Sequence, residues 1–290
     1  MAIDDLLDIG SSSTATRRLP GSDPARRLAL LSPLLYDPVR GVRIEAAAQL
    51  AGACTGAEFL TALVVAYELG IRAGVIRHAT CRTYHASGSW GAIAGAAAAG
   101  RLLGLDAQQL YNAMGAAEYH APIAPMMKGI DRPSMGKDSI GWGCMVAVLS
   151  ALMARAGFTG PARIFEADWG GFFGTYARTD PCPDKLVRDL GKTFGILRSG
   201  IKPYAACRDI HSTLDVVLAA RREHRLAPGD ISRIKVHCIP EMIQMVGNPA
   251  LPKTRLEAQL SLSYSIGVAL VTGRAFLSEY EPPLLADGEV

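Results

Sequence analysis

The sequence has no marked excess of either charge and no long apolar run. It carries 30 basic and 27 acidic residues, giving a net charge of +3, and it has no dense block of lysine and arginine. Such a balance provides no strongly basic surface, so we expect no nucleic-acid partner. The most apolar stretches, 60–67 and 145–154, are too short to cross a bilayer, so we expect no membrane partner either.

Cysteine is sparse and scattered. The six cysteines are Cys54, Cys81, Cys144, Cys182, Cys207 and Cys238. No two of them form a C-x-x-C pair, which argues against an iron–sulfur cluster or a cysteine-based zinc site. Wide spacing in a chain of 290 residues favours reduced thiols. Aspartates at positions 4, 5 and 8 are the wrong charge for a secretory leader. We therefore expect a cytoplasmic protein without a metal site.

The composition is that of a globular protein that forms a core. Hydrophobic residues make up 49% of the chain and charged residues 20%, and the length suits one large domain or two ordinary ones. Serines and prolines interrupt residues 1–44, which predicts an irregular lead-in. We predict a helical domain over 45–192 and a second domain over 193–290. The pattern changes after about Arg163, where glycines and prolines over 170–183 predict a loop-rich connection.

Helix signals follow one another in the first domain. Residues 55–58 form a capping box that predicts a helix, and Gly74 is a plausible end for it. The small residues of 88–103 predict a helix buried in the centre of a bundle, because they let neighbouring backbones come close. An Asp-x-x-Gln cap at 106–109 predicts the next helix, and 138–156 predicts another.

The second domain mixes helix and strand signals. A helix is expected to run to about Glu223, and a turn follows at 228–230. Apolar and polar residues alternate over 231–239, which predicts a strand with one solvated face. A final helix is expected over 257–272, closed by Gly273. The predicted fold class is mostly α: an all-helical domain followed by a smaller α+β domain.

One short segment concentrates charged and reactive side chains where a helix is expected to begin. Its residues are Lys202, Tyr204, Cys207, Arg208 and His211. Free N–H groups at a helix start, together with lysine and arginine, make a favourable site for carboxylates. Cys207 and His211 lie four residues apart and would share one face of that helix. The alternative is that these cations are simply solvated.

Three other residues precede or lie in predicted helices. His85 stands just before the small-residue helix and is either an acid/base group or a structural histidine. Lys137 precedes the 138–156 helix and either pairs with an anion or lies on the surface. Tyr264 either donates a proton or lies in the core with its hydroxyl bonded. Residues at the ends of a helical bundle are where sites are commonly built.

With these blocks in their order and spacing, the sequence resembles the MmgE/PrpD family, which includes 2-methylcitrate dehydratase, cis-aconitate decarboxylase and iminodisuccinate epimerase. The resemblance runs from about Gly52 to Gly273. The blocks that carry it are Thr55–Leu60, Tyr67-Glu68, His85 to Asp106, Lys137 with Gly141, Gly157–Pro161, Lys202–Tyr204 with Cys207 and His211, and Ser261 with Tyr264.

The resemblance implies a helical domain and an α+β lid in a dimer, with the site between the domains. It implies as catalytic residues His85, Lys137, Lys202, His211 and Tyr264. As substrate contacts we add Tyr204, Cys207, Arg208 and Ser87. No metal or other cofactor is expected. The chain is shorter than family members at both ends, so a second subunit that supplies a missing segment is the alternative to a homodimer.

The expected function is lyase chemistry next to a carboxylate of a small polycarboxylic acid. Lys202 and Arg208 would hold substrate carboxylates, Lys137 would stabilise a developing enolate, and His85 would be the leading acid/base. His211 or Tyr264 would handle the second proton. Dehydration of a 2-methylcitrate-like hydroxy acid is the first expectation. Decarboxylation, epimerisation, and a shortened non-catalytic or split-subunit relative that binds polycarboxylates are the alternatives.

Overall fold

The computed structural model describes residues 54–81, 83–136, 138–161, 187–247 and 251–286. These residues fall into two compact units. The first comprises the described residues up to 126 and those from 138 to 199, and the second comprises 127–136 and those from 200 on. The predicted lead-in over 1–44 lies outside the described residues.

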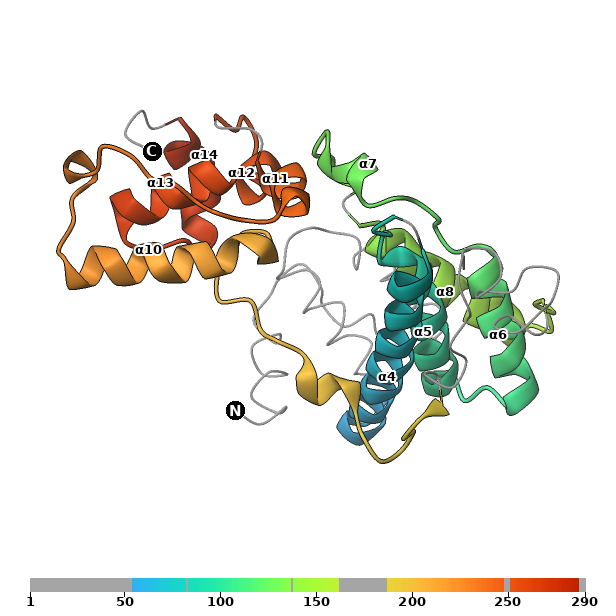
Figure 1. Ribbon diagram of the computed structural model, residues 1–290. Helices are drawn as coiled ribbons and strands as arrows, with labels where there is room; N and C mark the ends of the chain where they lie inside the picture. The colour runs from blue at the N-terminus through green and yellow to red at the C-terminus, as the bar shows by residue number, and fades with distance from the viewer. Residues whose placement is uncertain (1–53, 82, 137, 162–186, 248–250, 287–290) are drawn as a thin grey trace, which may run out of the picture. The chain divides into compact units, whose positions relative to one another are not determined.

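The first unit is a helical bundle built around one small-residue helix. Its elements are α4 (Gly56–Thr80), α5 (Gly88–Leu102), α6 (Ala107–Tyr119), α8 (Ile140–Arg155) and the 3-10 turn η4 (Gly195–Arg198). Helix α5 packs against α4, α6 and α8, as Figure 1 shows. The central placement expected for 88–103 is therefore confirmed.

Alanine and glycine make this close packing possible. The buried face of α5 includes Ala92 and Ala96, which pack with Ala147 of α8. A Cβ atom on Gly143 of α8 would lie 2.7 Å from the carbonyl oxygen of Gly88 at the start of α5. Only glycine at position 143 lets the two backbones meet at this point. Larger residues at these positions would separate the helices.

Helix α4 begins as predicted and ends later than predicted. The Thr55 hydroxyl accepts from the Glu58 N–H at 3.2 Å, and the Glu58 carboxylate accepts from the Thr55 N–H at 2.8 Å. The helix then continues through Gly74 to Thr80, so the stop expected at Gly74 is wrong. A Cβ on Gly74 would lie 3.0 Å from Nε1 of Trp90. Contact with that indole, rather than a turn, explains the glycine.

Helix α4 also has the length and composition of a membrane span, judged by those two properties alone. A buried core helix meets the same criteria. The inner face of α4 places Ala73 and Ile76 against Ile93 of α5. Its contacts with α5 are those of a helix in a packed bundle.

The second unit is a smaller helical cluster. Its longer helices are α10 (His211–Glu223) and α13 (Leu262–Thr272), which lie against each other (Figure 1). The shorter elements are α7 (Met127–Ile130), η5 (Arg208–Ile210), η6 (Pro228–Asp230), α11 (Pro240–Val246), α12 (Arg255–Gln259), η7 (Leu277–Tyr280) and α14 (Pro282–Leu285). Ile210, Leu214, Val268 and Tyr280 are fully buried in its core.

The mostly helical fold class is confirmed, but two details of the second domain differ from prediction. Residues 231–239 form no strand, and none of the described residues belongs to a strand. Alternation creates a two-faced segment, but a strand also needs a partner to bond with. The helix expected over 257–272 is two helices, α12 and α13. Ser261 breaks it, because its hydroxyl accepts from the Tyr264 N–H at 3.1 Å and starts a new helix.

Candidate functional site

The segment 202–207 has no regular secondary structure, bends at 203–206, and is joined to the rest of the second unit by two backbone hydrogen bonds. The Ala205 N–H donates to the Ala275 carbonyl at 3.1 Å, and the Cys207 N–H donates to the Gln259 carbonyl at 2.7 Å. The 3-10 turn η5 follows, and α10 begins only at His211. The prediction that Cys207 and His211 share one helix face is therefore wrong, because Cys207 caps η5 and lies outside α10.

His211 is the buried centre of this segment. Its side chain is 1% exposed, and its Nε2 lies 3.2 Å from the carbonyl oxygen of Ala206. Burial lowers the pKa of His211, and the positive charges of Lys202 and Arg208 lower it further. The Ala206 hydrogen bond and Asp215 act in the opposite direction without reversing the shift. At neutral pH this imidazole is uncharged.

Tyr204 packs against that imidazole. The two rings meet edge to face with their centroids 5.2 Å apart. The Tyr204 hydroxyl donates to the Asp215 carboxylate at 2.6 Å. Burial and the Asp215 hydrogen bond raise the pKa of Tyr204 to about 12, so the phenol keeps its proton. Asp215 stands one helical turn after His211 on α10.

Lys202, Cys207 and Arg208 complete the group. Lys202 and Arg208 have exposed side chains, and both lie close enough to act on the charge of His211. The Cys207 thiol is partly buried and lies 3.8 Å from the Asp209 carboxylate. Burial raises the pKa of Cys207, so it is a thiol rather than a thiolate. The structure thus brings together two exposed cationic side chains, a neutral imidazole, a phenol and a thiol.

Tyr264 lies deeper in the second unit. It is 4% exposed, and its hydroxyl donates to the Glu279 carbonyl at 2.8 Å. Its ring also lies 5.8 Å from that of Tyr280, centroid to centroid. The described structure therefore gives Tyr264 the bonded core position that was its alternative reading. A part in proton transfer stays a prediction.

His85 and Ser87 stand at the entry to α5 in the first unit. His85 is 5% exposed and pairs with Pro125 in an isolated antiparallel bridge. Burial lowers the pKa of His85, and Arg77 and His78 lower it further. Ser87 occupies the N-cap position of α5, where its hydroxyl makes no capping hydrogen bond. His85, like His211, is therefore an uncharged acid/base candidate.

Arg77 is a functional candidate that the sequence did not reveal. It lies in the last turn of α4 with 2% of its surface exposed. Its positive charge acts on His85, on His78 and on Glu118 of α6. Buried arginines are rare unless an anion balances them. The premature helix end assigned to Gly74 placed position 77 in a loop and hid this residue.

Lys137 lies outside the described residues, so its place is not given. His85 and Ser87 belong to the first unit, and the Lys202–His211 group and Tyr264 belong to the second. That both sets serve one substrate stays a prediction. Within the described residues, no three histidine, cysteine, aspartate or glutamate side chains are placed to hold a metal ion.

Two family models cover most of the chain. The MmgE/PrpD N-terminal domain matches residues 43–183, and the MmgE/PrpD C-terminal domain matches residues 204–290. The chain belongs to the MmgE/PrpD family. The second match begins at Tyr204, so it includes Cys207, Arg208, His211 and Tyr264.

Curated members of the MmgE/PrpD family with similar sequences carry decarboxylase names. A cis-aconitate decarboxylase-like protein of Aspergillus oryzae is 24% identical over 290 residues, covering 90% of this chain and 56% of the relative. The cis-aconitate decarboxylase of Aspergillus terreus is 25% identical over 259 residues, covering 81% of this chain and 51% of the relative. The chain thus spans about half the length of the curated relatives it matches.

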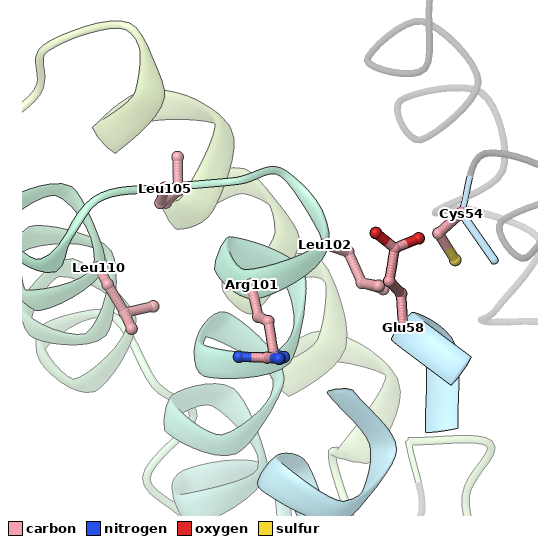
Figure 2. Close-up of a pocket in the computed structure, with 6 residues that line it drawn as sticks. All are labelled: Cys54, Glu58, Arg101, Leu102, Leu105 and Leu110. Atoms are coloured by element: carbon pink, nitrogen blue, oxygen red, sulfur yellow. The ribbon is translucent and has the colours of Figure 1, made fainter. Parts of the chain in front are cut away.

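The described residues of the first unit also form a hollow. Its volume is about 370 Å³, and it lies at the N-terminal end of α4 (Figure 2). The lining residues are Cys54, Glu58, Arg101, Leu102, Leu105 and Leu110. None of the predicted site residues lines it. The Glu58 carboxylate already accepts the Thr55 hydrogen bonds of the α4 cap, so it serves the helix rather than a ligand.

Proposed function

We propose that this chain binds a small polycarboxylate and acts as a lyase that decarboxylates it. The observation that carries the proposal is the neutral, buried His211 beside Lys202 and Arg208. Two cations with free ends suit two substrate carboxylates, and arginine adds a planar, bidentate contact. An uncharged imidazole next to them can accept or donate a proton without leaving its place.

The chemistry needs positive charge close to the reacting carbon. In decarboxylation, the bond between carbon and a carboxylate group breaks, and carbon dioxide leaves. The electron pair stays on the substrate, where it spreads into the neighbouring unsaturated carboxylate. A proton then adds to carbon and completes the product. Lys202 and Arg208 would stabilise the negative charge that gathers on the remaining carboxylate oxygens, which is the step with the highest energy.

Proton delivery falls to the two neutral imidazoles. His211 would serve as one acid/base group, and His85 of the first unit as the other. Each has its pKa lowered by burial and by neighbouring positive charge, so each is deprotonated near neutral pH. Such an imidazole would take up a proton from solvent and then pass it to the substrate carbon. Lys137 is proposed to contribute a further cation. The chain is proposed to work as a homodimer or with a second subunit.

The choice of decarboxylation rests on the relatives, both of which are named for that reaction on cis-aconitate. Dehydration of a 2-methylcitrate-like hydroxy acid, the first expectation from the sequence, also proceeds through negative charge next to a carboxylate. It differs in its leaving group, which is hydroxide taken off with a proton instead of carbon dioxide. One experiment separates the two reactions.

The experiment offers the purified chain cis-aconitate, a 2-methylcitrate-like hydroxy acid and a saturated tricarboxylate in heavy water. Proton and carbon NMR would follow loss of carbon dioxide, loss of water and deuterium entry next to a carboxylate. We expect carbon dioxide release from cis-aconitate with one deuterium added to carbon. Loss of water from the hydroxy acid alone would replace decarboxylation with dehydration. Binding of these acids without turnover would leave a binding protein and overturn catalysis.

Variants tie the activity to the site. Lys202→Ala and Arg208→Ala are each expected to lower kcat/KM by about 100-fold, the usual effect of removing one charge-stabilising donor. Lys235→Ala, which removes an exposed lysine from the 231–239 segment, is the matched control and should keep full activity. Equal activity in all three variants would overturn the assignment of this site.

A further inference from the structure

The carbonyl of Ala206 decides which nitrogen of His211 carries the proton. A carbonyl oxygen only accepts hydrogen bonds, and it lies 3.2 Å from Nε2 of the imidazole. Nε2 must therefore carry the hydrogen in the neutral ring. Nδ1 is then the nitrogen with the lone pair. It is buried and has no hydrogen-bond partner among the described residues.

Asp215 fixes the Tyr204 ring, which packs against the His211 imidazole. The Tyr204 phenol donates to Asp215 at 2.6 Å, and the Tyr204 ring contacts the His211 ring edge to face. Tyr204 precedes α10, whereas Asp215 and His211 lie one turn apart on it. The Tyr204–Asp215 hydrogen bond therefore anchors the tyrosine to α10, the same helix that carries His211. Among the described residues, Asp215 is the hydrogen-bond partner of the Tyr204 hydroxyl.

We infer that Asp215 is a positioning residue for His211: it fixes the Tyr204 ring against an imidazole whose proton sits on Nε2, leaving Nδ1 to accept a proton. The inference rests on the proposed function for the part that concerns turnover. The positioning itself concerns the unliganded chain and is tested without any substrate. Asp215 is not among the residues on which the sequence resemblance rests, and the sequence pattern gave no reason to select it.

The test compares three variants that separate charge from position. Asp215→Asn removes the negative charge but keeps an oxygen that accepts from the Tyr204 hydroxyl. Asp215→Ala removes both the charge and the bond. Tyr204→Phe keeps the charge and removes the bond. Glu223→Gln removes an exposed carboxylate from the same helix and is the matched control. Nitrogen-15 NMR of the full chain reports the tautomer and the titration of His211 in each.

The charges that act on His211 fix the expected order. Lys202 and Arg208 lower its pKa and are present in every variant, whereas Asp215 raises it. Losing the Asp215 charge alone should therefore lower the pKa in Asp215→Asn. Asp215→Ala loses the same charge and also frees the covering ring, so its His211 pKa should lie above that of Asp215→Asn by about half a unit or more. Tyr204→Phe should raise it above the parent value, and Glu223→Gln should leave it unchanged.

The outcomes are decisive in both directions. A hydrogen on Nε2, together with the stated order of pKa values, supports the inference. A hydrogen on Nδ1, or equal pKa values in Asp215→Ala and Asp215→Asn, overturns it. If the parent chain turns over a polycarboxylate, Asp215→Ala should lose about 10-fold in kcat with little change in KM, and Asp215→Asn should recover most of it. If no polycarboxylate is turned over, the proposed function fails while the NMR result still judges the positioning.

Discussion

Nε of Arg221, near the end of α10, donates a hydrogen bond of 2.7 Å to the carbonyl oxygen of Leu270 in α13. Nη2 of the same guanidinium lies 3.5 Å from the carbonyl of Val271. Carbonyls in the last turn of a helix have no partner within that helix, and the helix dipole places negative charge there. One arginine thus satisfies the end of α13 and couples the two main helices of the second unit.

Removing this guanidinium should destabilise the second unit. We expect Arg221→Leu to lower the free energy of unfolding by about 2 kcal/mol, because partly buried carbonyls lose a charged donor. Urea unfolding followed by circular dichroism measures the loss. Arg222→Leu is the control, since Arg222 is exposed and donates to the Leu218 carbonyl within its own helix. Its effect should stay within about 0.5 kcal/mol. Equal losses in the two variants would contradict the role of Arg221.

Gly273 allows a direct test of the same contact. It ends α13 with φ +77°, and an added Cβ would lie 2.7 Å from Nη1 of Arg221. Gly104 ends α5 with φ +67°, but a Cβ there would meet open space. Gly104→Ala should therefore cost about 1 kcal/mol, for backbone strain alone. Gly273→Ala should cost about 1 kcal/mol more, because it also displaces the guanidinium.

The extra free-energy cost of Gly273→Ala over Gly104→Ala should depend on Arg221. In an Arg221→Leu background, Gly273→Ala should cost no more than Gly104→Ala, since the crowded atom is gone. Urea unfolding of Arg221→Leu, Gly104→Ala, Gly273→Ala and the double variant Arg221→Leu/Gly273→Ala measures these costs. An excess that persists without the arginine would show that the strain lies elsewhere.

Helix ends were readable from the sequence wherever a local side chain or backbone conformation decides them. The capping boxes at Thr55 and Asp106 are present, and Gly104 and Gly273 both adopt the left-handed conformation expected of a helix stop. These features depend on residues within one turn of each other. They therefore do not depend on how the rest of the chain folds.

Features that depend on distant contacts were not readable. Gly74 has the composition of a helix stop, but contact with Trp90 makes it an interior residue. Residues 231–239 alternate as a strand does, yet no described segment pairs with them. In both cases the local pattern permits two structures, and tertiary contacts select one. Ser261 is an exception, because its cap on the Tyr264 N–H is local, yet the apolar pattern continues across the break and hid it.

The candidate site shows the same division. The Lys202–His211 segment was found because its reactive side chains are close together in sequence. Asp215 was missed because it is an ordinary surface type on a helix, and only its tertiary hydrogen bond gives it a role. Arg77 was missed because the helix end expected at Gly74 placed it in a loop, and only its burial marks it. No sequence spacing marks such residues. Their assignment required the positions of His85 and Tyr204.

Glu68 ties α4 to the segment that precedes the second unit. Its carboxylate accepts from Arg72 Nε at 2.6 Å and from the N–H of Gly195 at 2.8 Å. Burial tends to raise the pKa of Glu68, but these hydrogen bonds outweigh it and lower the pKa. Glu68→Ala should lower the free energy of unfolding by about 3 kcal/mol, since it removes a buried carboxylate that accepts from both Arg72 Nε and the Gly195 amide.

Hydrogen exchange locates that loss. The Gly195 amide should exchange much faster in Glu68→Ala, and η4 should open before the helices of the bundle do. Glu118→Ala, on α6, removes another partly buried carboxylate of the same unit and is the control. It should leave the Gly195 amide protected. Unchanged exchange at Gly195 in Glu68→Ala would contradict the proposed tie.

Stability should fall as the pH drops from about 7 to about 5. Burial lowers the pKa of His85 and of His211 in the folded chain, whereas an unfolded histidine titrates near 6.5. In this range the unfolded chain binds more protons than the folded chain. The stabilising contribution of each neutral histidine is therefore complete above about pH 6.5 and is lost as the pH falls through the folded pKa. The lowered pKa values of Glu58, Glu68 and Glu279 act in the same direction, but below about pH 4.5.

His211→Gln isolates the contribution of His211 to the pH dependence of stability. A glutamine amide can still donate to the Ala206 carbonyl, so the fold is retained, but the side chain no longer binds a proton on unfolding. The slope of unfolding free energy against pH, measured with urea between about pH 7 and pH 5, should therefore be shallower than in the parent chain. His237→Gln, at an exposed position, should keep the parent slope. Equal slopes for the parent chain and His211→Gln would mean that His211 binds a proton as readily in the folded chain as in the unfolded chain. That result would contradict the neutral imidazole on which the proposed proton transfer depends.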